Sequence, residues 1–209
     1  PLALNNLGII YYEGKYIEQD IDKAIHYFTL AADQGHSDAQ FYLGVFYYDC
    51  KYIQQDIDKA IHYLSLAANQ GHSNAQFYLG LIFDRSDSTH NDISKAIHYY
   101  SLAADQNNPN AQFNLGLVYD RSDNTHKYIS DIIHYYSRAA DQNIPNAQFN
   151  LGLIYEEGKY VERNINKAIY YYSLASNQNY SNAQFNLGVI YYEGKYIQPD
   201  INKAIYYFS

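Results

Sequence analysis

Residues 39–48 have the sequence AQFYLGVFYY, and close copies of this stretch return at 75–84, 111–120 and 147–156. A period of about 20–50 residues is typical of a solenoid, in which each copy gains a core only by stacking on its neighbours. Here one Leu-Gly pair returns every 36 residues, at Leu7-Gly8, Leu43-Gly44, Leu79-Gly80, Leu115-Gly116, Leu151-Gly152 and Leu187-Gly188. The spacing predicts one repeat copied six times, with its function on a surface.

Each repeat predicts two helices. In the second repeat, Ser37 and Gln40 form a capping-box pattern, and apolar residues at helical spacing then predict a helix over about 38–49. Asp56 is the expected N-cap of a second helix that ends at Gly71. Asparagine, the next-best residue for the left-handed conformation that ends a helix, occupies this last position in later repeats: Asn107, Asn143 and Asn179.

The repeated glycine stands in the middle of the first helix, where it costs about 1 kcal/mol relative to alanine. We expect a close helix crossing to compensate, which makes Gly44 and its equivalents packing residues. The expected domain is one array over 1–209 with repeats at 3–38, 39–74, 75–110, 111–146, 147–182 and 183–209. The last repeat is truncated at Ser209, so we expect the chain to be a fragment of a longer protein.

The repeats resemble the Sel-one-like repeat (SLR) family, which is close to the tetratricopeptide repeats (TPR). The motifs are A-x-x-x-L-G-x-x-Y, then G-K-Y-I or a variant, then K-A-x-x-Y-x-x-x-A. In the fifth repeat they are carried by Ala147, Leu151, Gly152, Tyr155, Gly158, Lys159, Tyr160, Val161, Lys167, Ala168, Tyr171 and Ala175. The resemblance implies an all-α fold, a right-handed α-α superhelix (solenoid) of six helical hairpins whose first helices line the concave face.

The resemblance also implies a binding surface, because related TPR arrays contact ligands at positions equivalent to Phe41, Val45, Tyr48 and Asp49. Along the array the Tyr48 position is held by Tyr12, Tyr48, Asp84, Asp120, Glu156 and Tyr192. The next position is held by Glu13, Asp49, Arg85, Arg121, Glu157 and Glu193. Tyrosines with charges at intervals suit a peptide or helix of a protein partner. The alternative is that the tyrosines cover core and the charges pair with one another.

Composition limits the other classes of function. Lys and Arg number 14 against 22 Asp and Glu, and this net charge of −8 argues against nucleic acid as a partner. The single Cys50 excludes an intrachain disulfide, as expected of a reducing, cytoplasmic location or of a chain that does not depend on oxidation. No apolar run is long enough to enter a membrane as a span, and no catalytic constellation, cofactor motif or metal site emerges. We therefore expect a scaffold or adaptor and not an enzyme.

Two other functions remain open. Near-identical repeats with uncapped ends can self-associate end to end, which would make the chain a structural assembly element. Some secreted bacterial relatives, with a disulfide in every repeat, imply a cell-wall-ligand binder or hydrolase; the lone Cys50 departs from that pattern.

Further surface features are a row on the second helices and two loops. The row comprises Leu30, Leu66, Leu102, Arg138 and Leu174 with His26, His62, His98 and His134. It is either a lateral contact surface or packed against the neighbouring repeat. Equivalent histidines in stacked repeats lie about 10 Å apart, too far to share a metal. The loops 85–90 and 121–126 each place Asp and His three residues apart, and we interpret both as structural replacements of the Gly-Lys-Tyr turn.

The fourth repeat departs most from the pattern. Asp131-Ile132 replaces Lys-Ala, and Tyr128 stands at the expected N-cap of the second helix. We expect Ser130 to cap that helix instead, so that the helix begins about half a turn late. We expect this displaced cap to make the fourth repeat the weakest.

Overall fold

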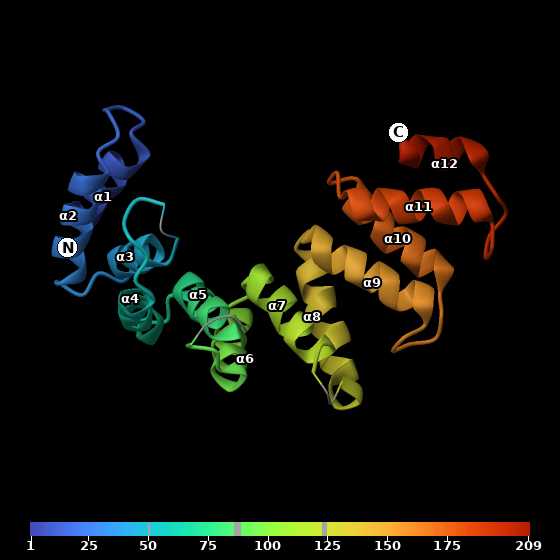
Figure 1. The fold of residues 1–209 in the computed structure, drawn as a ribbon, viewed down its shortest axis with the longest axis horizontal. Helices are drawn as coiled ribbons and strands as arrows, with labels where there is room; N and C mark the ends of the chain where they lie inside the picture. Colours follow the sequence, from blue (N-terminus) through green and yellow to red (C-terminus); the bar gives the residue numbers. More distant parts are fainter. Residues whose placement is uncertain (50, 86–88, 123–124) are drawn as a thin grey trace. The chain divides into compact units, whose positions relative to one another are not determined.

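The computed structural model describes residues 1–49, 51–85, 89–122 and 125–209. Within these ranges the chain forms twelve α-helices and one short 3-10 helix, with no strand (Figure 1). The helices are α1 (Leu2–Glu13), α2 (Ile21–Ala32), α3 (Ser37–Asp49), α4 (Ile57–Asn69), α5 (Ser73–Asp84), α6 (Ile93–Asp105), α7 (Pro109–Asp120), η1 (Thr125–Tyr128), α8 (Ile129–Asp141), α9 (Pro145–Glu157), α10 (Ile165–Ser176), α11 (Ser181–Glu193) and α12 (Ile201–Phe208). The predicted all-α solenoid of helical hairpins is confirmed.

The helices form two compact units, an N-terminal unit, Pro1–Ala111, and a C-terminal unit, Gln112–Ser209. In the N-terminal unit α1 packs on α2, α3 on α4 and α5 on α6, and α2 and α4 each contact the hairpin that follows. The C-terminal unit repeats this order, with α9 on α10 and α11 on α12. A single uninterrupted array over 1–209 stays a prediction.

The predicted N-cap Asp56 and the predicted residues that end the second helices are confirmed. The side chain of Asp56 accepts a 2.9 Å hydrogen bond from the backbone N–H of Lys59 and so satisfies a donor at the start of α4. The same cap is formed by Asp20, Asp92, Asn164 and Asp200. A residue with positive φ follows the end of each of the helices α2, α4, α6, α8 and α10, and this set comprises Gly35, Gly71, Asn107, Asn143 and Asn179.

The mid-helix glycines lie at close helix crossings, as predicted. A Cβ added at Gly44 would come within 2.6 Å of Cγ of Leu64 on α4. At Gly116 it would come within 2.7 Å of Cδ1 of Tyr136 on α8. Both partners are fully buried, so the crossing leaves room for no side chain at either glycine.

The capping-box prediction was wrong. Ser37 is the first residue of α3, and the buried Gln40 instead links two hairpins. Its amide donates to the carbonyl of Ala32 at the end of α2, and its oxygen accepts from Gln70 at 2.7 Å. Each such glutamine thereby joins the last turn of the preceding second helix to the end of its own hairpin. The arrangement returns where Gln76 meets Gln106 and where Gln148 meets Gln178.

The fourth repeat also differs from the prediction. Helix α8 begins at Ile129, in register with the other second helices, so Ser130 does not delay it. Tyr128 occupies the N-cap position and makes no side-chain capping hydrogen bond. Its ring stacks on Tyr119 at 4.7 Å. In other repeats a lysine lies over the ring equivalent to Tyr119, as Lys59 lies over Tyr47. In the fourth repeat Asp131 stands at the position of that lysine.

Candidate functional site

In each unit we call the surface formed by the first helices the A-helix face of that unit: α1, α3 and α5 in the N-terminal unit, and α7, α9 and α11 in the C-terminal unit. All predicted partner-binding residues lie on these helices or directly after them. The N-terminal unit carries Tyr12, Phe41, Tyr48, Asp49, Asp84 and Arg85. The C-terminal unit carries Asp120, Arg121, Glu156 and Tyr192.

In the N-terminal unit the A-helix face carries a continuous row of half-buried aromatic rings. Tyr12 contacts Tyr42 with ring centroids 6.1 Å apart, and Tyr42 contacts Phe41 at 5.8 Å. Phe41 contacts Tyr78 at 5.7 Å, and Tyr78 contacts Tyr48 at 5.6 Å. The sequence had identified three of these five rings. Tyr42 and Tyr78 were missed because they stand one position after the expected contact position, although an aromatic pair in both repeats was a visible signal.

Phe41 also helps to order the next hairpin. Its ring stacks on His72 at 4.6 Å, and Nδ1 of His72 accepts a hydrogen bond from the backbone N–H of Ala75 at the start of α5. The other ring nitrogen lies 3.3 Å from the carboxylate of Asp38. Burial lowers the pKa of His72, and this effect outweighs the opposing pull of Asp38.

The acids of the A-helix face have a role inside the fold. The Tyr172 hydroxyl donates to Oε2 of Glu156 at 2.6 Å, and the Tyr136 hydroxyl donates to Oδ2 of Asp120 at 3.3 Å. Both tyrosine side chains are fully buried, and a buried hydroxyl needs an acceptor. Burial, reinforced by the neighbouring carboxylate, raises the pKa of both tyrosines.

These acids and tyrosines vary together along the six repeats. Wherever the second helix buries a tyrosine, the position equivalent to Tyr48 near the end of the first helix holds an acid: Asp84 with Tyr100, Asp120 with Tyr136, and Glu156 with Tyr172. Wherever the second helix has Phe or Leu, that position holds a tyrosine: Tyr12 with Phe28, Tyr48 with Leu64, and Tyr192 with Phe208. The acids therefore satisfy core hydroxyls, whatever else they contact.

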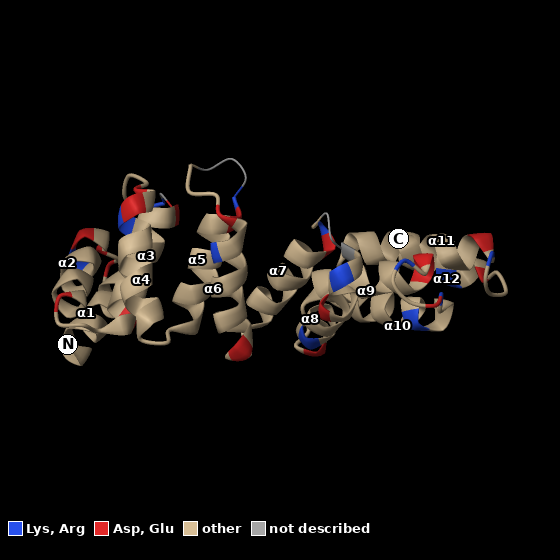
Figure 2. Cartoon of the chain, turned by 90° about the horizontal axis from the view of Figure 1, so that it is seen from below, with Lys and Arg blue, Asp and Glu red and all other residues tan. Residues whose placement is uncertain are grey.

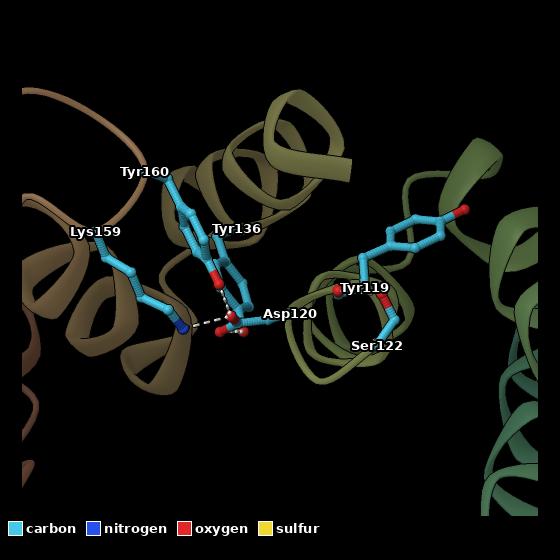
Figure 3. Close-up of polar contacts among 6 residues, drawn as sticks. All are labelled: Tyr119, Asp120, Ser122, Tyr136, Lys159 and Tyr160. Atoms are coloured by element: carbon cyan, nitrogen blue, oxygen red, sulfur yellow. Dashed lines mark hydrogen bonds and ion pairs between the residues drawn. The ribbon is translucent and has the colours of Figure 1, made fainter. Parts of the chain in front are cut away.

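Asp120 has further donors within the C-terminal unit (Figure 3). Its Oδ1 accepts a hydrogen bond from the Tyr160 hydroxyl and a 2.9 Å charged hydrogen bond from Nζ of Lys159. Tyr119, the residue before it, points to the other side of the helix (Figure 3). Lys159 and Tyr160 belong to the Gly-Lys-Tyr turn of the following repeat, so this carboxylate also ties two repeats together.

The two predicted arginines lie at helix ends and are exposed. Arg85 is the C-cap residue of α5, and the backbone N–H of Arg121 donates to the carbonyl of Leu117 in α7. Most charged residues in each unit lie near helix ends and in turns (Figure 2). In the C-terminal unit Tyr192 is 63% exposed. The A-helix face of that unit is hollowed beside Leu153 and Val189, with Phe185, Glu157 and Arg163 also lining a cavity of about 350 Å³.

The row on the second helices is partly open to solvent. Leu30, Leu66 and Leu102 each leave more than a third of their surface exposed. His62 packs edge-on against Tyr63 at 5.1 Å, and His26, His98 and His134 repeat this contact with the tyrosine that follows each. The leucines are therefore not tucked fully against the neighbouring repeat.

Among the described residues, no group of three or more His, Cys, Asp or Glu is placed to hold a metal ion. No helix among them has the length and apolar character to cross a membrane. Cys50 and the Asp87 and Asp123 positions of the two loops, about which the sequence made predictions, lie outside the described ranges.

The stacked helical hairpins define the class of protein as a TPR-like α-solenoid. The chain belongs to the Sel1 repeat family, whose model matches residues 1–36, 37–72, 73–108, 109–125, 133–144, 145–180 and 181–209. The break between 125 and 133 falls on the altered start of α8. Proteins of this family are generally non-catalytic scaffolds for protein–protein interactions. A comparison with curated protein sequences finds no significant match.

Solved structures agree with this assignment. The chain is 33% identical to c5321, a protective antigen of uropathogenic Escherichia coli with an SLR fold, at a TM-score of 0.88 over 99% of this chain and 44% of that one. It therefore spans less than half of that protein. A Sel1 repeat protein from Oxalobacter formigenes is 26% identical, at a TM-score of 0.86 over 100% of this chain and 83% of that one. The immunity protein Pa5087 of Pseudomonas aeruginosa, 21% identical at a TM-score of 0.57 over 99% of this chain and 78% of that one, is similar in fold alone.

Proposed function

We propose that this chain is a non-catalytic interaction scaffold that binds a peptide or helix of a partner protein on its A-helix face. The observation that supports this most is the row of five half-buried rings in the N-terminal unit, from Tyr12 to Tyr48. Each ring is held by its neighbours and still presents part of its surface to solvent. Rigid aromatic side chains of this kind supply contact area at a low cost in conformational entropy.

The predicted charges have a more limited part in this proposal. Asp120 and Glu156 already accept hydrogen bonds from buried tyrosines, so part of their capacity to accept hydrogen bonds is taken up within the fold. Arg85 of the N-terminal unit and Arg121 of the C-terminal unit are exposed, and exposed charges influence association rate and register more than affinity. We propose that the rings provide affinity and that each arginine orients the partner on its own unit, in a cytoplasmic setting.

Affinity capture from source-cell extract tests the proposal with two matched double variants. Tyr48→Ala with Tyr78→Ala removes part of the ring row, and Leu66→Lys with Leu102→Lys changes the second-helix row of the same unit. The proposal predicts that the first variant loses its captured partners while the second retains them. If the lysine variant loses its captured partners and the alanine variant retains them, the functional surface lies on the second helices.

A competing proposal is self-association. Consecutive near-identical hairpins stack on one another in the N-terminal unit, and the same kind of contact can form between chains. Light scattering coupled to size-exclusion chromatography distinguishes the two. End-to-end assembly predicts a mass that grows with concentration, whereas a scaffold predicts a constant mass.

A further inference from the structure

A cavity lies beside α9 and α11, the first helices of the fifth and sixth repeats. Its volume of about 350 Å³ is within the range of about 300–1,000 Å³ that is typical of pockets for small ligands. Apolar or aromatic side chains and polar side chains share its lining, which comprises Leu153, Phe185, Val189 and Tyr196 together with Glu156, Glu157, Arg163 and Asn186. All of these residues belong to the C-terminal unit and to the described ranges.

A buried hydroxyl fixes the polarity of the cavity. Tyr172 gives its single hydroxyl proton to Oε2 of Glu156 at 2.6 Å. The same hydroxyl oxygen accepts a 3.1 Å hydrogen bond from Nδ2 of Asn186. Because Tyr172 cannot donate twice, Asn186 must present its N–H group to the hydroxyl, and its amide oxygen Oδ1 remains an acceptor. Glu156 and Asn186 are therefore held in place by the core and each offers an acceptor oxygen.

The cation in the lining lies on an aromatic ring. The guanidinium of Arg163 is 4.9 Å from the centre of the Tyr196 ring. Gln55, at the position equivalent to Arg163 in the second repeat, instead donates a hydrogen bond to the backbone carbonyl of Tyr48. The lining thus combines two carboxylates with one guanidinium, and this excess of negative charge favours a cationic ligand.

Acids stand at both of the adjacent positions 156 and 157 in the fifth repeat alone. The equivalent pairs in the other repeats are Tyr12-Glu13, Tyr48-Asp49, Asp84-Arg85, Asp120-Arg121 and Tyr192-Glu193. In the fourth repeat Asp120, the equivalent of Glu156, accepts a 2.9 Å charged hydrogen bond from Nζ of Lys159. A basic side chain on an acid at this position is therefore a contact that the fold already accommodates.

We propose that this cavity is a recognition pocket for an arginine side chain of the protein partner. The proposal rests on the scaffold function above and specifies the chemistry of the partner on the C-terminal unit. The acceptors are the carboxylates of Glu156 and Glu157 and the amide oxygen of Asn186. They require a ligand with several donors, and a guanidinium has five in one plane.

The apolar part of the lining suits the rest of an arginine side chain. Leu153 and Val189 offer contact area to its methylene groups. The ring of Phe185 offers a surface for the planar guanidinium, in the way that Tyr196 already carries Arg163. A guanidinium is also less strongly hydrated than an ammonium, so its transfer from water into a half-apolar cavity costs less.

The test follows the methyl NMR signals of Leu153 and Val189 in the whole chain as N-acetyl-argininamide is added. Saturable shifts of both signals are expected. N-acetyl-citrullinamide, which has the same shape without the charge, should bind about three- to tenfold more weakly, because charged hydrogen bonds and the cation–ring contact are lost. N-acetyl-lysinamide should also bind more weakly, since an ammonium is more strongly hydrated and is not planar. Equal binding of the citrulline or the lysine compound would overturn an arginine pocket.

Matched variants separate the pocket from the general negative charge of the chain. Glu157→Gln should weaken the binding of N-acetyl-argininamide about two- to fivefold, whereas Glu193→Gln, at the equivalent position of the sixth repeat, should leave it nearly unchanged. Arg163→Gln introduces the glutamine of the second repeat and removes the competing cation, so binding should become tighter, which a loss of folding would not produce. Equal weakening by the two glutamate variants, or weaker binding by Arg163→Gln, would overturn the pocket.

A blocked peptide tests the source of the arginine. The pentapeptide Gly-Ser-Arg-Ser-Gly, acetylated and amidated, should shift the same signals, because the cavity hollows the A-helix face of its unit. If the peptide is excluded while N-acetyl-argininamide binds, the ligand is a free guanidinium compound and the proposal is overturned. Absence of shifts with N-acetyl-argininamide would overturn the pocket even if partner capture persists. Capture that ignores the ring row would overturn the scaffold proposal even if N-acetyl-argininamide binds.

Discussion

The hydroxyl of Tyr172 in α10 donates a 2.6 Å hydrogen bond to Oε2 of Glu156 at the end of α9. Because Tyr172 is fully buried, this bond explains why an acid stands on the A-helix face at this point. The same relationship holds between Asp120 and Tyr136. Charges that look like a binding surface in the sequence are thus partly a consequence of tyrosines in the core.

This relationship predicts a non-additive pair of substitutions. Glu156→Ala should lower the free energy of unfolding by about 1–3 kcal/mol, because it leaves a buried hydroxyl without its carboxylate acceptor. The double variant Tyr172→Phe with Glu156→Tyr reproduces the Phe28 and Tyr12 pair of the first repeat, and it should recover most of that loss. Urea denaturation measures both. If the losses of unfolding free energy simply add in the double variant, the two residues are not coupled.

The crossing at Gly116 predicts a strong steric effect. Gly116→Val should destabilise the chain by about 1–3 kcal/mol, since a Cβ there would come within 2.7 Å of Tyr136. Glu162→Ala, in an exposed turn of the same unit, is the control and should leave the melting temperature nearly unchanged. Equal melting temperatures for the two variants would contradict the crossing.

The helix end at Asn143 predicts opposite effects of two small substitutions. Its φ of 62° lies in the left-handed region, where a side chain without a local hydrogen bond costs about 1–2 kcal/mol. Asn143→Ala should therefore be destabilising, whereas Asn143→Gly should be neutral or stabilising. Thermal denaturation ranks the two, and a more stable alanine variant would be inconsistent with this backbone conformation.

The N-cap aspartates predict a dependence of stability on pH. Hydrogen bonds from Lys95 lower the pKa of Asp92 below its ordinary 3.8, so the folded state binds this proton less readily than the unfolded state. The resulting stabilisation is present above the unfolded pKa and is lost as pH falls through the folded pKa. Asp92→Asn keeps a capping side chain, as Asn164 shows, but does not titrate.

The difference in unfolding free energy between the original chain and Asp92→Asn should therefore be constant above about pH 5 and shrink toward pH 3. Urea titrations at a series of pH values measure it. A difference that grows as the pH falls would mean that the sign assigned to this cap is wrong.

The sequence predicted what depends on local pattern. The Leu-Gly period, the Asp56 cap and the asparagines at 107, 143 and 179 each fixed a helix or its end, because these features act through the backbone of neighbouring residues. Gln40 was misinterpreted because its decisive partner, Gln70, lies 30 residues away, while a local capping pattern gave an equally simple explanation. The prediction that Ser130 caps α8 was wrong for a related reason, because packing keeps α8 in register without a capping side chain.

The candidate site was predictable in position but not in chemistry. Tyr48 and Phe41 were expected on the first helices and lie there. Their organisation into a row depends on Tyr42 and Tyr78. These contacts join side chains of consecutive repeats, so the spacing of residues within one repeat does not predict them.

Photo-crosslinking shows directly whether the partner lies on the A-helix face of the N-terminal unit. The crosslinking residue p-benzoylphenylalanine is placed in turn at Tyr48 and at Tyr78, both in the ring row. Leu66 and Leu102, on the second helices of the same unit, serve as the matched positions. Binding on this face predicts covalent adducts with the captured partner from the two tyrosine positions and none from the two leucine positions. Adducts from Leu66 and Leu102 alone would contradict it.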